Sequence, residues 1–91
     1  MKKTIVTRTL LISRIQALLD KKITTSEFGD EMILYLVLDD QYVFEENHEK
    51  LIDQVLCEFM DMHDADKGNV GYEPYIPPQQ RMLEIIDQLK K

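Results

Sequence analysis

The sequence has little of what several common protein classes require. It contains a single cysteine, Cys57, among 91 residues, so no disulfide can form within the chain and no paired thiols can hold zinc. Three glycines and three prolines are too few for a turn-rich β protein or a disordered chain, and they supply no glycine-rich loop to cradle phosphate. The longest apolar run, Met32 to Leu38, has seven residues, far below the roughly 20 that span a bilayer.

Basic residues are also nearly absent from the middle of the chain. Residues 1–22 carry six basic side chains and one acid, a net +5, and residues 67–91 carry a net +1. Residues 23–66 carry thirteen acids against Lys50 alone, a net −12, within a whole-chain charge of −6. This central block repels phosphate, so direct nucleic-acid binding is not expected. A basic partner is expected instead.

What is present indicates one domain, 1–91, built from amphipathic helices. Apolar residues recur with the period of an α-helix in four segments, which are Thr4 to Lys21, Thr25 to Asp40, Phe44 to His63 and Pro78 to Lys90. Mostly short connections between them predict an all-α fold, an antiparallel four-helix bundle. The exception is Asp64 to Pro78, whose glycines and prolines predict a long, functional loop.

Three local features bear on the second helix. Thr24 stands three residues before Glu27, the spacing of a capping box in which each side chain satisfies a backbone N–H at a helix start. The apolar run from Met32 to Leu38 could also be a buried strand, but the upstream cap favours a helix. Gly29 either allows another element to approach closely or is tolerated at a cost of about 1 kcal/mol.

No catalytic or metal-binding constellation emerges. An EF-hand loop beginning at Asp64 needs glycine at its sixth position and glutamate at its twelfth, where Asn69 and Tyr75 stand. His48 and His63 lie fifteen residues apart without the spacing of a zinc site. We therefore expect a binding protein rather than an enzyme, with no cofactor and no metal.

Cys57 falls in the predicted third helix, where a small, semi-buried packing role is favoured over that of a nucleophile. A lone cysteine also fits a reducing compartment. Arg8 and Arg14 interrupt the apolar stretch that a signal peptide would need. We accordingly expect a cytoplasmic protein that does not enter a membrane.

Acidic residues gather at the end of the third helix and in the loop behind it, with only Lys67 opposing them. Acidic side chains on a helix usually do no more than face solvent. Acids crowded into one region, however, repel one another and destabilise the fold, a cost that a purely structural protein has little reason to accept. An acidic patch with nearby tyrosines can imitate phosphates and stacked bases. We predict a partner-binding site made of Glu58, Asp61, His63, Asp64, Asp66, Tyr72 and Glu73. Secondary contacts are predicted at Asp39, Asp40, Tyr42 and Glu45.

Four segments resemble the colicin D immunity protein family, which includes immunity proteins of contact-dependent growth inhibition systems. The segment from Leu18 to Phe28, reading LLDKKITTSEF, is similar to the junction of the family's first two helices. The motif Asp64-Ala65-Asp66-Lys67, then Tyr72-Glu73 and a closing helix from Arg81 to Lys91, is similar to the end of the family's sequences. The resemblance spans most of the chain in order.

This resemblance implies a four-helix bundle that binds and neutralises a cognate toxin, typically a tRNA-cleaving RNase. In the colicin D case, acids of the inhibitor are understood to occupy the toxin's basic active-site groove in place of tRNA phosphate. Asp64 and Asp66 match the family's Asp-Ala-Asp motif residue for residue. The family's preceding acids do not align, because Phe59 and Met62 stand nearest to them while Glu58 and Asp61 sit one step away.

The leading hypothesis is therefore an immunity protein that forms a one-to-one complex with a nuclease toxin domain and masks its basic groove. The alternative is an acidic helical adaptor that docks on a basic protein without inhibiting any enzyme. A gene located directly downstream of the region encoding a toxin's C-terminal domain would favour the first hypothesis.

Overall fold

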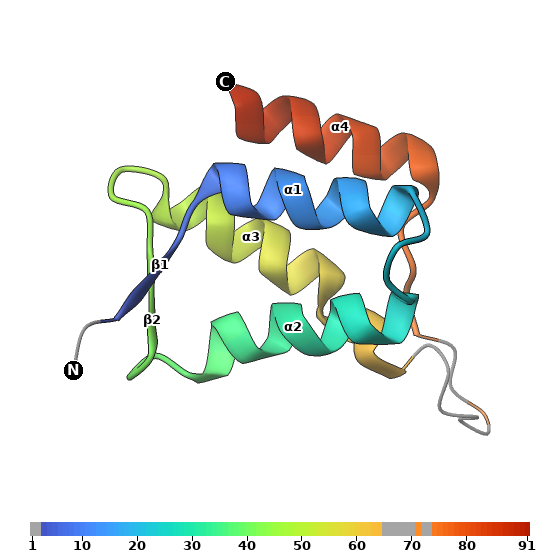
Figure 1. Cartoon of the computed structure of the whole chain (residues 1–91), viewed down its shortest axis with the longest axis horizontal. Helices are drawn as coiled ribbons and strands as arrows, with labels where there is room; N and C mark the ends of the chain where they lie inside the picture. Colours follow the sequence, from blue (N-terminus) through green and yellow to red (C-terminus); the bar gives the residue numbers. More distant parts are fainter. Residues whose placement is uncertain (1–2, 65–70, 72–73) are drawn as a thin grey trace.

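The computed structural model describes residues 3–64, 71 and 74–91. Four α-helices, one 3-10 helix and two short strands make up this part of the chain. Figure 1 shows that successive α-helices run in opposite directions. In chain order the elements are β1 (Thr4–Val6), α1 (Arg8–Leu19), α2 (Thr25–Val37), β2 (Tyr42–Phe44), α3 (Glu49–Phe59), the 3-10 helix η1 (Met60–Asp64) and α4 (Gln79–Lys90).

The prediction of a mostly helical fold is confirmed, but a strictly all-α fold was wrong. Residues Thr4–Val6, expected to begin the first helix, form a strand that pairs in parallel with Tyr42–Phe44. Both segments consist of β-branched and aromatic residues, which favour extended backbone. Thr7 then caps α1 by accepting a hydrogen bond from the Leu10 N–H at 3.0 Å, so the first helix starts at Arg8.

The second helix begins as predicted. Thr24 Oγ accepts from the Glu27 N–H at 3.1 Å, and Glu27 Oε1 accepts from the Thr24 N–H at 3.0 Å. This reciprocal capping box is complete, and the apolar run that could have been a strand is helical as far as Val37. The helix ends before Asp40 because the chain turns there into β2.

The predicted third helix is divided into three elements. Phe44, expected at its start, belongs to β2, and α3 begins only at Glu49. After Phe59 the chain tightens into η1, which includes Asp64, a residue expected in the loop. Pro78 caps the start of α4 rather than forming its first residue, so the fourth helix agrees with the prediction to within one residue.

The core lies between the helices and is wholly apolar in the described part of the chain. Phe28 of α2 and Phe59 of α3 meet edge to face at its centre, with ring centroids 5.1 Å apart. Around them α1 packs along α4, while α2 packs on α3 and η1. The buried apolar side chains are Val6, Leu11, Ile15, Phe28, Met32, Ile52, Val55, Leu56, Phe59, Met62, Met82, Ile85, Ile86 and Leu89.

None of the helices in the described ranges is both long enough and apolar enough to cross a membrane.

Candidate functional site

The end of α3 and the whole of η1 form a surface platform for acidic side chains. Buried Phe59 and Met62 anchor this segment to the core, and the residues between and after them are turned outward. Asp61, His63 and Asp64 are each half-buried. The structure therefore brings together three of the side chains predicted to contact a partner.

Gly29 fixes this platform against α2. A Cβ at this position would overlap the Met62 carbonyl carbon and the His63 nitrogen and would lie 2.7 Å from His63 Cα. Only glycine permits this contact of backbone with backbone. The Ser26 hydroxyl adds a hydrogen bond to the His63 carbonyl oxygen at 3.3 Å. Of the two roles considered for Gly29, the structure shows the first, because Gly29 allows η1 to approach α2 closely.

The two ring nitrogens of His63 each contact an oxygen atom of η1 itself. Its Nδ1 lies 2.9 Å from the Met60 carbonyl oxygen, and its Nε2 lies 3.1 Å from Asp64 Oδ1. Both partners are acceptors, so both contacts are hydrogen bonds only when the imidazole carries two protons. The His63 ring thus lies between the Met60 carbonyl group and the Asp64 carboxylate.

Glu58 is already engaged within the chain. Arg81 of α4 donates to both of its carboxylate oxygens, Nε to Oε2 and Nη2 to Oε1, each at 2.8 Å. The Tyr75 hydroxyl donates to Oε2 at 3.5 Å. Hydrogen bonds from Arg81 lower the pKa of the Glu58 carboxyl. Its charge is thus compensated by α4, which makes it a weaker candidate for the partner than Asp61 or Asp64.

The Glu58–Arg81 pair should give the fold a measurable acid sensitivity. Because the folded-state pKa of Glu58 lies below the ordinary 4.5, the stabilisation is complete at neutral pH and is lost as the pH falls through that lowered pKa. Glu58→Gln should lower the free energy of unfolding by about 1 kcal/mol at pH 7, since the pair is bidentate but only partly buried. Urea titrations at pH 7 and pH 3 would show the difference shrinking in acid.

Glu84→Gln is the matched control for this measurement. Glu84 also faces Arg81, but at 3.6 Å and with half of its side chain exposed, so its removal should change stability less at either pH. An equal loss from both variants at pH 7 would contradict the special role of Glu58.

The predicted secondary contacts lie elsewhere. The segment that follows α2 and leads into β2 is at the other end of α2 from η1 (Figure 1). Asp39 and Asp40 are exposed there, and the Tyr42 ring meets Tyr35 edge to face, with centroids 4.9 Å apart. Eight residues of α2, Asp30 to Val37, lie between the Gly29 contact with η1 and this segment, about 12 Å at 1.5 Å per residue. The two groups therefore lie at different positions along α2.

Glu45, the remaining secondary candidate, pairs with Arg8. Its Oε1 accepts from the Arg8 backbone N–H at 2.9 Å and from Nε at 3.2 Å, while Oε2 lies 3.1 Å from Nη2. These hydrogen bonds lower the pKa of the Glu45 carboxyl. Glu45 therefore stabilises the start of α1 and, like Glu58, is compensated by an arginine distant in sequence.

Three of the predicted contact residues, Asp66, Tyr72 and Glu73, lie outside the described residues. Within the described ranges, no group of three or more histidine, cysteine or acidic side chains could hold a metal ion. Cys57 is exposed rather than semi-buried. Partial desolvation and the neighbouring Asp53 raise the pKa of its thiol, which disfavours the reactive thiolate.

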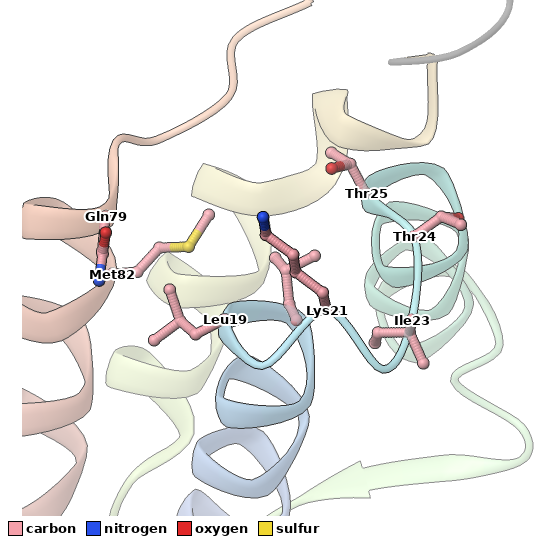
Figure 2. A pocket seen from close by; sticks show the side chains of 8 residues that line it. Leu19, Lys21, Ile23, Thr24, Thr25, Gln79 and Met82 are labelled. Carbon is pink, nitrogen blue, oxygen red and sulfur yellow. The ribbon is translucent and has the colours of Figure 1, made fainter.

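A hollow of about 530 Å³ lies between the α1–α2 connection and the start of α4. Figure 2 shows Met82 and Gln79 of α4 on one side, Thr24 and Thr25 on the other, and Lys21 between them. Lys21 adopts a left-handed backbone conformation with φ 61°. The segment from Leu18 to Thr25, which carries part of the family resemblance, supplies most of the lining. The apolar part of this lining consists of Leu18, Leu19, Ile23 and Met82.

Comparison with known proteins gives no match to a family model, to a curated protein or to a solved structure.

Proposed function

We propose that this chain is an immunity protein that binds a nuclease toxin one-to-one and masks the toxin's basic substrate groove. The observation that carries the proposal is the η1 platform, on which Asp61 and Asp64 stand at the surface of a segment packed backbone to backbone on α2. Carboxylates held in place before binding lose little conformational freedom when they meet a basic groove. Crowding of acids in residues 23–66 adds long-range attraction that accelerates association.

The sequence resemblance supports the same assignment. Its first segment, LLDKKITTSEF, ends in α2, and Asp64, the first residue of the second motif, lies in η1, which packs on α2. Under this proposal the partner is a tRNA-cleaving toxin of a colicin or contact-dependent growth inhibition system. The chain would act in the cytoplasm as a four-helix inhibitor, without catalysis of its own and without binding nucleic acid or membrane.

Co-expression with the product of the gene directly upstream, followed by co-purification and an RNase assay, tests the proposal. We expect a stable one-to-one complex in which RNA cleavage is abolished. Binding that leaves cleavage intact would favour the acidic adaptor, and absence of binding would overturn the assignment. Because the attraction is electrostatic, the association rate should fall steeply as salt is added.

Single substitutions locate the contact. Asp61→Ala and Asp64→Ala are each expected to weaken binding by about 2–5 kcal/mol, the cost of removing one partner of a desolvated charge pair. Isothermal titration calorimetry against the toxin domain would measure this loss. Asp87→Ala is the matched control, because Asp87 is an exposed acid on α4. Glu27 is a poor control since it caps α2. Small and equal losses from all three variants would move the interface away from η1.

A further inference from the structure

The hollow of about 530 Å³ beside the α1–α2 connection, here called the Lys21 hollow, differs in charge from other depressions of the surface. The described residues that line it are Leu18, Leu19, Lys21, Ile23, Thr24, Thr25, Gln79 and Met82. Lys21 alone among them is charged, although the chain has 17 acids and a net charge of −6. Four other hollows on the described surface, of about 310–460 Å³, each include an acid. The Lys21 hollow is therefore the one of these five that suits an anion.

The end of α1 fixes the backbone of Lys21 at the edge of this hollow. The Lys21 N–H donates to the Leu18 carbonyl oxygen at 3.0 Å. The next N–H, that of Lys22, donates to the Ala17 carbonyl oxygen at 2.9 Å. These two hydrogen bonds form a Schellman motif, in which the turning residue has a left-handed backbone and is usually glycine. Lys21 holds this position with φ 61°, where a side chain is less favourable than glycine.

The Lys21 ammonium group is available to a ligand. Its side chain is exposed, and no hydrogen bond or ion pair joins it to another residue in the described part of the chain. Figure 2 shows the side chain extending into the space between Met82 and Thr25, with its nitrogen at the far end. The two acids nearest in sequence, Asp20 and Glu27, do not line the hollow, and Glu27 is engaged in the capping box of α2.

The remaining lining combines aliphatic surface with hydroxyl groups. Met82 is buried, and the three other aliphatic side chains are half-buried against the core, so this surface is in place before a ligand binds. None of the described lining residues is aromatic. The surface therefore offers close contact to an alkyl chain but no stacking to a ring. Thr24 and Thr25 add hydroxyl groups, which can donate to an anion.

We propose that the Lys21 hollow binds a small organic acid with an aliphatic chain. The single ammonium group matches the single charge of a carboxylate, which also accepts a hydrogen bond from the Thr25 hydroxyl. The alkyl chain of the ligand lies on the aliphatic lining. The volume of about 530 Å³ falls within the roughly 300–1,000 Å³ of small-molecule sites. No residue of η1 lines the hollow, so this inference does not depend on the toxin contact proposed above.

An NMR titration of the ¹⁵N-labelled full chain with hexanoate tests the proposal. We expect a dissociation constant of about 1 mM and amide shifts centred on Lys21, Thr25 and Met82. Acetate, which lacks most of the alkyl chain, should bind about tenfold more weakly. Hexan-1-ol, which lacks the charge, should bind about threefold more weakly. Shifts centred elsewhere, no shifts, or equal affinity for hexanoate and hexan-1-ol would overturn the inference.

Lys21→Gly separates ligand binding from stability. Glycine relieves the left-handed residue, so the urea midpoint of unfolding should rise, while hexanoate should bind about threefold more weakly because its charge partner is gone. Lys22→Gly is the matched control, because Lys22 is an exposed lysine that neither lines the hollow nor has a left-handed backbone. This control should leave hexanoate binding unchanged and should not raise the midpoint. Equal binding by the parent chain and Lys21→Gly would refute the site.

Discussion

Replacing Gly29 with alanine is expected to lower the free energy of unfolding by about 3 kcal/mol. The added Cβ would enter space occupied by backbone atoms of η1, so no change of side-chain rotamer can relieve the overlap. Overpacking of this kind costs about 1–3 kcal/mol and occasionally more. At an open helical position the same change would instead stabilise by about 1 kcal/mol. Whether Gly29→Ala raises or lowers the free energy of unfolding, measured with urea, therefore shows whether η1 packs directly against Gly29.

Ser13→Ala is the control for this experiment, because Ser13 is exposed on α1 and its substitution should change stability by less than about 0.5 kcal/mol. A neutral or stabilising effect of Gly29→Ala would show that η1 does not lie against α2. Under the proposed function, the same variant should also weaken binding of a toxin, since a displaced η1 carries Asp61 and Asp64 with it.

Phe59→Ala is expected to destabilise the fold by about 3–5 kcal/mol. The ring is fully buried and meets Phe28 edge to face at the centre of the core. Its removal forfeits the transfer free energy of a large apolar group and leaves a cavity between α2 and α3. The aromatic contact itself contributes about 0.5–1.5 kcal/mol of this loss. Chemical denaturation of the variant and the parent protein would measure the difference.

Phe59→Leu separates volume from aromaticity. It keeps most of the apolar volume, so it should cost about 2 kcal/mol, well below the alanine variant. A loss under about 1 kcal/mol from Phe59→Ala would indicate that the α3–η1 junction is not anchored in the core. Both variants retain the surface acids, so under the proposed function a folded Phe59→Leu protein should still bind the toxin.

The features predicted correctly from the sequence are those set by neighbouring residues. Thr24 and Glu27 are three residues apart, and their reciprocal hydrogen bonds need only the local backbone. The apolar stripes of α3 and α4 likewise follow from helical periodicity. The two strands were missed because three residues are too few to show an alternating pattern, and because Ile5 pairs with Val43, 38 positions away.

The same distinction applies to the candidate site. The crowding of acids near Asp61 and Asp64 is visible in the sequence, but the arginines that compensate Glu58 and Glu45 lie 23 and 37 positions away from them. No local pattern connects those pairs. Nor does the sequence reveal that the Tyr35 and Tyr42 rings pack edge to face, because the chain must fold back into β2 before the rings can meet.

The packing of α1 along α4 has a consequence for biosynthesis. Roughly 70 residues separate the start of α1 from the start of α4, so a ribosome adding about 5–20 residues per second needs several seconds to supply the second helix after the first. During that interval Leu11 and Ile15, buried in the finished fold, lack the surface they finally pack against. We therefore expect folding to be completed only once residues 79–90 have emerged.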